Sequence, residues 1–311
     1  MSAQPNRHNE APQAARQGGL LRRLSAWWGG DEAGADQIEP HLKRVAAGLP
    51  TEGPWRPERV ALLQQLFGEG MLTPGGDAVL NRLFRPLELD AEARVVELGA
   101  GLGGVAVRLA RKTGAAIAAF EDQVALADQA SLWLDGCGVD VKLDRRDLQD
   151  TGLRRHYADA VISMEGLTPI RNKRAILRHA CHVLKPDGRL VFVDLFVTGD
   201  DPDCPEVAVW SALEHRPMYL TSTAGMSDLL FDIGFELPEF VDVTDAYLGS
   251  IRTGFRKGAE LLAGDTSGDI GLRRMMLEEA EYWNRRLALI ESGEVRVLCV
   301  STAIFQGGEF V

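Results

Sequence analysis

Several features that mark particular classes of protein are scarce or missing in this chain of 311 residues. It has only four cysteines, at positions 137, 181, 204 and 299, and no two of them form a C-x-x-C pair. This spacing supports neither a zinc ribbon nor a dithiol redox motif, and it predicts free thiols in a reducing, cytoplasmic compartment. The six histidines show no H-E-x-x-H spacing, which predicts that the protein binds no metal.

The chain also lacks an excess of positive charge and a long apolar run. Its 34 Lys and Arg residues are outnumbered by 45 Asp and Glu residues, which gives a formal net charge of −11. This balance argues against nucleic acid as a partner, because phosphates are contacted by clustered Lys and Arg. No run of about 18 apolar residues occurs, so the sequence predicts no membrane-spanning helix.

The first 55 residues differ from the rest and are predicted to form a partly disordered, partly helical extension. Residues 1–30 contain four arginines and a single acidic residue. Within them, residues 19–28 (GLLRRLSAWW) form a short basic amphipathic segment. Such a segment is typical of a helix that lies on a membrane surface or docks on a partner. We favour the alternative that it folds onto its own domain, and the composition also fits a transit peptide.

Strand and helix patterns alternate from residue 56 to residue 200. Predicted strands lie at 94–98, 116–120, 139–143, 159–163 and 189–194, and predicted helices at 59–72, 75–87, 103–112, 124–134 and 172–184. This alternation is typical of parallel βαβ units. Beyond it we expect a lid at 198–224, a helix at 227–233, a strand at 240–243, a helical cap insert at 246–292 and a last strand at 295–305.

A glycine-rich turn directly follows the first predicted strand. Residues 95–104 read VVELGAGLGG, and a helical pattern then opens at Val105. Glycines permit a close backbone approach to a ligand and backbone angles that side chains disfavour. The helix that follows directs unpaired N–H groups back at the turn. In open α/β sheets, ligands bind at this end of the strands.

Three acidic residues are predicted to lie along that same edge of the sheet. Glu97 ends the first strand, Glu121 follows the second and Asp147 follows the third. A carboxylate at Glu121 could accept both ribose hydroxyls. Asp147 could accept the amino group of adenine, with Arg146 or Leu148 beside the ring. Glu97 could meet a cationic group close to the turn.

The position of Glu97 distinguishes two nucleoside cofactors. The turn also matches G-x-G-x-x-G, the fingerprint of dinucleotide binding. An acid at Glu97 would repel a diphosphate. S-adenosylmethionine has no phosphate and carries an ammonium and a sulfonium, so an acidic rim suits it.

The motifs together resemble those of class I S-adenosylmethionine-dependent methyltransferases. Residues 97–103 (ELGAGLG) resemble the first motif of that family, and 184–190 (LKPDGRL) the turn before its fifth strand. Glu121 and Asp147 fit its acidic residues after strands two and three. The resemblance covers about residues 56–305. It implies a doubly wound, Rossmann-like α/β fold over 56–311, with a seven-stranded sheet whose last strand runs antiparallel between neighbours. It also implies that S-adenosylmethionine is held by Glu97, Gly99, Ala100, Gly101, Gly103, Glu121, Asp122, Arg146, Asp147, Leu148 and Met164.

The segment after the fourth strand narrows the class of acceptor. Family members that methylate amino groups of nucleobases or glutamine often carry Asp/Asn-Pro-Pro-Tyr there, whereas residues 163–167 read SMEGL. This is closer to the small-molecule branch, which includes quinone, sarcosine/dimethylglycine and cyclopropane-fatty-acid type enzymes. Residues 210–235 resemble the lid of those enzymes. The implied activity is in-line transfer of a methyl group to a small molecule.

Two residues are candidates for chemistry at the acceptor. Glu165 could remove a proton or hold a cationic amine, and its alternative roles are cofactor contact and helix capping. Tyr219, on the predicted lid, could cover a methylated ammonium by cation–π attraction, or simply pack the lid. Two other functions stay open at this point: an NAD(P)-dependent oxidoreductase, and a non-catalytic binding or scaffold protein of methyltransferase fold.

Overall fold

The structure is a computed structural model that describes residues 53–199, 201–264 and 269–306. The amphipathic segment 19–28 lies outside these residues. None of the helices in the described ranges combines the length and the apolar character that a bilayer crossing requires.

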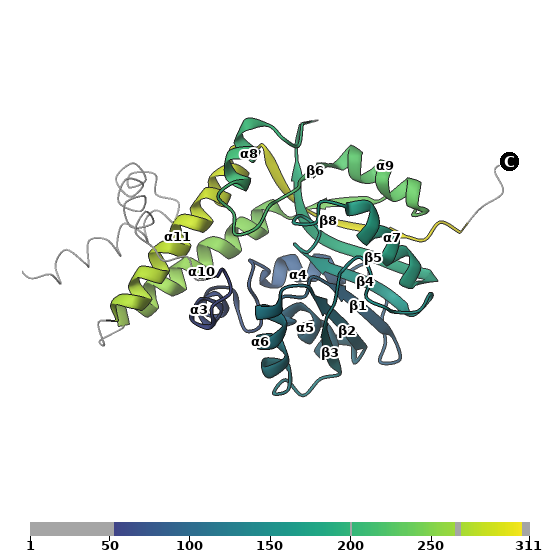
Figure 1. Cartoon of the computed structure of the whole chain (residues 1–311), viewed down its shortest axis with the longest axis horizontal. Helices are drawn as coiled ribbons and strands as arrows, with labels where there is room; N and C mark the ends of the chain where they lie inside the picture. Colours follow the sequence, from purple (N-terminus) through teal and green to yellow (C-terminus); the bar gives the residue numbers. More distant parts are fainter. Residues whose placement is uncertain (1–52, 200, 265–268, 307–311) are drawn as a thin grey trace, which may run out of the picture.

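A mixed β-sheet forms the centre of the molecule (Figure 1). Its strands are β1 (Arg94–Leu98), β2 (Ala116–Glu121), β3 (Val141–Arg145), β4 (Ala158–Met164), β5 (Leu184–Val197), β6 (Thr221–Ser222), β7 (Glu239–Asp242) and β8 (Val295–Ala303). Their order is β3-β2-β1-β4-β5-β8-β7, and the short β6 pairs with β5 beside this path. The last strand, β8, runs antiparallel to both β5 and β7. The predicted fold is therefore confirmed, with β6 as an additional strand.

Helices cover both faces of the sheet. They are α3 (Pro57–Phe67), α4 (Gly76–Phe84), α5 (Gly104–Thr113), α6 (Val124–Leu134), α7 (Lys173–Val183), α8 (Pro205–Ser211), α9 (Thr223–Ile233), α10 (Thr244–Gly264) and α11 (Ile270–Glu291). Alternate strand residues enter two cores: Val95 packs with α4 and α5, whereas Val96 packs with α7 and α9. Burial on both faces explains the continuous apolar runs of the central strands.

Most element boundaries differ slightly from the predicted ones, for local reasons. α3 ends at Phe67 instead of residue 72, because the Gly68 N–H caps it by bonding to the Gln64 carbonyl. β3 begins at Val141 instead of residue 139, and Val141 pairs with Ile117 of β2. The predicted helix 227–233 begins four residues earlier, where the Ser222 side chain accepts the N–H of Gly225. Helix α8, inside the predicted lid, was not predicted.

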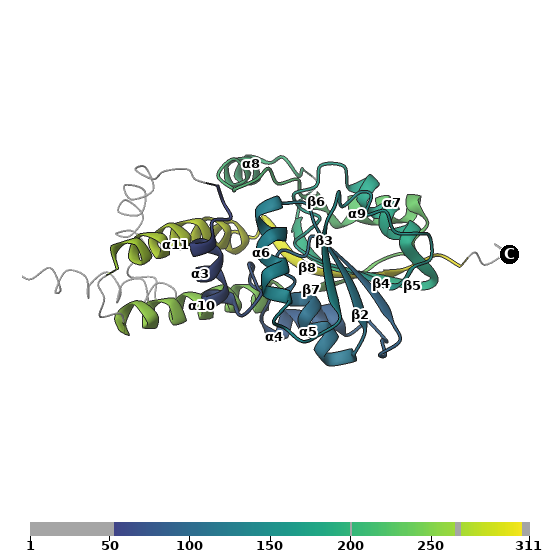
Figure 2. The same cartoon turned by 60° about the horizontal axis from the view of Figure 1, so that its bottom comes forward.

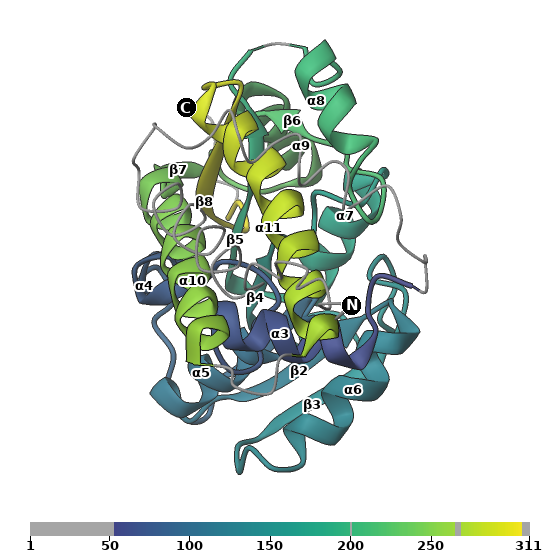
Figure 3. The same ribbon diagram turned by 90° about the vertical axis from the view of Figure 1, so that its left-hand side faces the viewer.

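Three helices form a separate layer beside the sheet. α10 and α11 extend side by side away from the sheet, and α3 packs against them (Figures 2 and 3). Two glycines of α10 allow the close approach of α3. A Cβ added at Gly254 would lie 2.8 Å from the Leu66 carbonyl oxygen, and one added at Gly258 would lie 2.8 Å from Leu66 Cδ2. A buried ion pair between Arg59 of α3 and Glu279 of α11 completes the unit.

The packing of α3 on α10 can be tested with two Gly→Ala substitutions in the same helix. Gly254→Ala should lower the free energy of unfolding by about 1–3 kcal/mol, because the new methyl group overlaps the α3 backbone. Gly249→Ala is the matched control, since nothing lies within 4 Å of its added Cβ. It should stabilise the protein by about 0.5–1 kcal/mol through helix propensity. Urea unfolding would measure both, and equal stabilisation by the two variants would contradict this packing.

Candidate functional site

The glycine-rich turn joins β1 to α5 with a sharply bent backbone. Gly99, Gly101 and Gly103 have φ values of 76°, 58° and 86°, in the region that favours glycine. The N–H groups of Gly99 and Ala100 donate to the Phe120 carbonyl of β2, at 2.9 and 3.0 Å. A Cβ on Gly99 would lie 2.8 Å from the Gly166 Cα. The turn is thus fixed between β2 and the loop after β4.

A second close backbone contact joins the turn to the segment after α3. The Gly104 N–H donates to the Gly70 carbonyl at 3.1 Å, and a Cβ on Gly104 would lie 2.3 Å from that oxygen. This contact brings Met71 and Leu72 to the mouth of the site, where both line the pocket. Sequence reasoning missed this segment, because its glycines occur in a region predicted to continue a helix.

Glu121 connects the end of β2 to the glycine turn. One carboxylate oxygen accepts the Gly101 N–H at 2.8 Å, and the other accepts the Gln123 N–H at 2.9 Å. The side chain is buried, and burial raises the pKa of Glu121 to about 7, while these two hydrogen bonds act in the opposite direction. The carboxylate therefore bonds to the glycine turn, and its contact with ribose hydroxyls stays a prediction.

Glu97 is an incompletely partnered acid beneath the turn. Only 1% of the residue is exposed, and its Oε2 atom has no hydrogen-bond partner among the described residues. Burial raises the pKa of Glu97 to about 8, against the effect of a hydrogen bond from the Ala106 N–H. A buried, unsatisfied oxygen of this kind calls for a ligand donor.

One pocket contains six of the predicted cofactor residues. Its lining includes Leu102 and Gly104 of the turn and these six predicted residues: Glu97, Gly99, Ala100, Gly101, Glu121 and Met164. The other five predicted residues are not among its lining residues: Gly103, Asp122, Arg146, Asp147 and Leu148.

These five residues have other surroundings. Gly103 caps α5, and Asp122 accepts the side-chain amide of Gln123. Leu148 is buried, whereas Arg146 and Asp147 are exposed. The Arg146 N–H donates to the Glu121 carbonyl, and the Asp147 carboxylate accepts the Gln149 N–H. Their roles toward a cofactor remain predictions.

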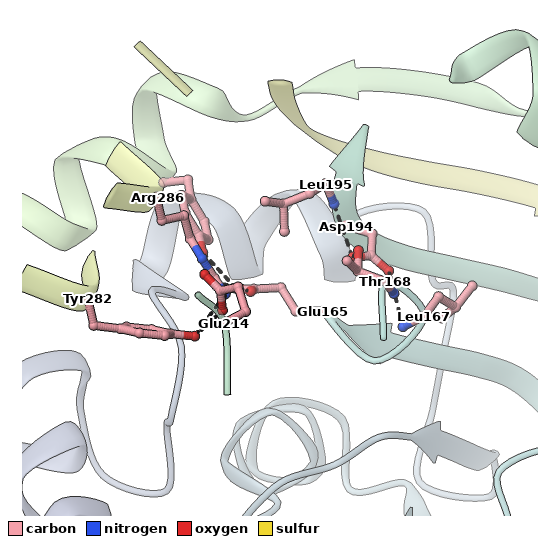
Figure 4. A network of polar contacts seen from close by, with 9 residues as sticks. Glu165, Leu167, Thr168, Asp194, Leu195, Glu214, Tyr282 and Arg286 are labelled. Atoms are coloured by element: carbon pink, nitrogen blue, oxygen red, sulfur yellow. Dashed lines mark hydrogen bonds and ion pairs between the residues drawn. The ribbon is translucent and has the colours of Figure 1, made fainter. Parts of the chain in front are cut away.

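Glu165 lines the pocket, and both of its carboxylate oxygens are engaged (Figure 4). Its φ is 54°, an uncommon value for a residue with a side chain. Oε1 accepts the Tyr247 hydroxyl of α10 at 2.9 Å, and Oε2 accepts an Arg286 N–H of α11 at 2.6 Å. Burial raises the pKa of Glu165, and the charge of Arg286 opposes that shift. A catalytic role for Glu165 stays a prediction.

Arg286 is the hub of this buried network. It also donates to Glu214, in the loop after α8, at 2.9 Å, and Glu214 accepts the Tyr282 hydroxyl. Its guanidinium lies 4.8 to 5.7 Å from the ring centroids of Trp210, Tyr282 and Trp283. One cation therefore joins the end of β4, the loop after α8 and both long helices.

Asp194, three residues before the end of β5, holds the neighbouring loop. Its carboxylate accepts the N–H groups of Leu167 and Thr168, at 3.1 and 2.8 Å, and also the Thr168 hydroxyl (Figure 4). Tyr219 is attached to the same loop, because its N–H donates to the Thr168 carbonyl at 2.8 Å. Tyr219 is not among the pocket-lining residues, and its contact with an acceptor stays a prediction.

Sequence reasoning missed the wall opposite the glycine turn. Five residues of this wall line the pocket. Trp55 lies just before α3 and Arg59 lies in its first turn. The other three lie on α11: Tyr282, Trp283 and Arg286. The one available signal was the spacing of Tyr282 and Arg286, since residues four apart share a helix face. Nothing in the sequence shows that this face meets the end of β4.

Residues 95–188 match a protein-family model described as a methyltransferase domain. Among curated proteins, the chain is 23% identical over 189 residues to phosphoethanolamine N-methyltransferase 3 of Arabidopsis thaliana, covering 61% of this chain and 38% of that one. It is 27% identical over 205 residues to an O-methyltransferase of Pyrenophora dematioidea, covering 64% of this chain and 72% of that one. The chain thus spans well under half the length of the Arabidopsis relative.

A solved structure shares the fold over most of the described residues. It is phosphoethanolamine N-methyltransferase 2 of Haemonchus contortus, in complex with phosphomonomethylethanolamine and S-adenosylhomocysteine. The TM-score is 0.69 at 15% identity, covering 79% of this chain and 57% of that one. The predicted resemblance is confirmed: the chain contains a methyltransferase domain, in the fold of the S-adenosylmethionine-dependent enzymes.

Proposed function

We propose that this protein is an S-adenosylmethionine-dependent methyltransferase that acts on a small molecule. The observation that carries the proposal is the acidic cradle at the glycine turn, formed by Glu97 and Glu121 at the carboxyl ends of neighbouring strands. Both acids line the one pocket that also holds the turn. The family match over residues 95–188 supports the same activity.

The cradle fits the chemical groups of this cofactor. The unpartnered Glu97 Oε2 would be satisfied by a donor with positive charge, such as the ammonium of the methionyl part. Glu121 has two oxygens at the bend and could accept the ribose hydroxyls in addition to its backbone donors. Each of these acids would repel a diphosphate in its ionised form, which argues against a nicotinamide dinucleotide.

The residues of the chain would mainly position the reactants and exclude water. S-adenosylmethionine supplies a methyl group that its sulfonium already activates, so the protein needs little covalent chemistry. Glu165 and Arg286 of the buried network line the pocket, together with other residues of α3 and α11. We further propose that residues 198–224 act as a lid and 246–292 as a cap, with Asp122, Arg146, Asp147 and Leu148 on the adenine side.

The acceptor class rests on the relatives. One similar protein is named for phosphoethanolamine and another only as an O-methyltransferase, and both names fit small-molecule acceptors. We retain Glu165 and Tyr219 as candidates for contact with the acceptor. A cytoplasmic location likewise remains a proposal.

Removing one charge from the cradle tests the cofactor assignment. Glu121→Gln keeps the shape but places an amide where the structure has a carboxylate that accepts two N–H groups. Affinity for S-adenosylmethionine should fall about 10- to 100-fold, the usual effect of losing hydrogen bonds to a charged group. Isothermal calorimetry would measure it, with the exposed Glu88→Gln as the matched control. Binding of NADH in place of S-adenosylmethionine by the wild-type protein would reverse the assignment.

The raised pKa of Glu97 predicts how stability depends on pH. The folded protein holds this proton up to about pH 8, whereas an unfolded glutamic acid loses it near its ordinary value of 4.5. The stability contributed by the protonated form is therefore present below pH 4.5 and is lost as pH rises toward 8. Between pH 5 and pH 8 the cofactor-free protein should lose on the order of 2–4 kcal/mol through this group.

Glu97→Gln is the variant that isolates this effect. An uncharged amide has no proton to lose, so its unfolding free energy should depend less on pH over the same range. Chemical denaturation at four or five pH values would compare the variant with the wild type. Parallel pH profiles for the two proteins would show that Glu97 is ionised in the folded state and that burial does not raise its pKa.

A further inference from the structure

The pocket has two electrostatically different halves. The cofactor half contains the two acids of the cradle, and Glu97 Oε2 is an unpartnered atom there. Arg216 also lines the pocket, and its charge opposes the rise that burial causes in the pKa of Glu121. The opposite half contains the arginines Arg59 and Arg286 and the aromatic side chains Trp55, Tyr282 and Trp283. A ligand that fills both halves must therefore offer positive charge to one and a different group to the other.

Carboxylate oxygens in the opposite half are already engaged by arginines. Both oxygens of Glu279 accept from Arg59, and the two oxygens of Glu165 accept from Tyr247 and Arg286. A cationic amine in this half would have to compete with Arg286 and Tyr247 for the Glu165 carboxylate that lines the pocket.

Two buried N–H donors in this half have no acceptor. They are the indole N–H of Trp283 and the Nε–H of Arg286, both unpartnered among the described residues and both from side chains that line the pocket. The two residues are 2% and 3% exposed. An unsatisfied buried donor is destabilising, so an acceptor oxygen supplied by a ligand would stabilise this arrangement.

The aromatic and titratable side chains of the same wall also bear on which ligand fits here. The aromatic side chains of Trp55, Tyr282 and Trp283 line the pocket on this side. The ring of His215 stacks on Tyr282 at a centroid distance of 4.5 Å. Burial and the positive charges of the surrounding arginines, Arg59 first among them, lower the pKa of His215. Burial and these arginines thus disfavour a positive charge on His215 itself.

We propose that the acceptor is a flat, largely apolar molecule with an acidic hydroxyl group, a phenol or an enol, which binds as its oxyanion against Trp283 and Arg286. This inference rests on the proposed methyltransferase function. Transfer would form one C–O bond as the methyl–sulfur bond breaks, with the electron pair staying on sulfur. The hydroxyl proton leaves to solvent on binding, so a dedicated base is not required, in agreement with the fully engaged Glu165.

The experiment uses coloured phenols as optical probes. The full chain is saturated with S-adenosylhomocysteine and titrated with 4-nitrophenol, 4-nitrocatechol and a nitronaphthol, at a pH where each free probe is mostly protonated. At least one should bind with the absorption band of its phenolate. Binding only as the neutral phenol, or no binding by any of the three, would overturn the proposal.

Two tryptophan variants locate the interaction. Trp283→Phe removes a pocket N–H and should weaken phenolate binding about tenfold or more, the usual effect of losing a hydrogen bond to a charged group. Trp210→Phe is the matched control, because its N–H is also buried and unpartnered and its ring also lies over Arg286, but it does not line the pocket. It should change binding less than twofold. Equal losses in both variants would contradict the assignment.

Two further measurements separate the possible failures. Affinity for S-adenosylhomocysteine should be unchanged in both variants; if the wild-type protein does not bind it at all, the proposed function itself is wrong. A methyl-transfer assay then compares the phenols with phosphoethanolamine. Methylation of phosphoethanolamine in preference to every phenol and enol tested would leave the methyltransferase function intact and overturn only the acceptor class. The wild-type spectrum alone decides the matter if Trp283→Phe does not fold.

Discussion

A single buried cation organises the site. Arg286 of α11 bonds to Glu165 after β4 and to Glu214 after α8, so the sheet, the loop above it and the outer helices meet at one guanidinium. Buried ion pairs are costly to desolvate and add little net stability, but breaking one is strongly destabilising. The network therefore acts mainly to fix geometry. With Arg286 in place, α11 presents its aromatic face to the pocket at a defined position.

The two halves of the pocket contain buried groups of opposite charge. Near the glycine turn, burial raises the pKa of both Glu97 and Glu121, so the charged forms of the two acids are disfavoured there. At the other end, Arg59 and Arg286 are balanced by carboxylates, yet hydrogen-bonding capacity remains at Arg286 and Trp283. A methyl donor with positive charge and an acceptor with negative charge would complement these halves. Ligand binding would then supply partners for buried polar groups that have none in the folded protein.

The cofactor side of the site could be predicted because it is local in sequence. A strand, an acid and three glycines occupy consecutive positions, and their backbone angles follow from residue type. Glu121 could be added because the carboxyl ends of parallel strands share an edge. Boundaries were less predictable: β3 begins two residues late because its pairing with Ile117, not its composition, sets its start. The helix α8 carries too short a pattern to be recognised.

The sequence by itself determined the fold class, the alternation of strands and helices and the acidic glycine turn, since each depends on periodicity and on residues close together in the chain. Only the tertiary structure decided what faces that turn. Arg59 and Glu279 are 220 residues apart, and Glu165 and Arg286 are 121 apart. No local pattern encodes which helix faces meet over such distances, because the meeting depends on how α3, α10 and α11 pack together. The character of the acceptor wall follows from that packing.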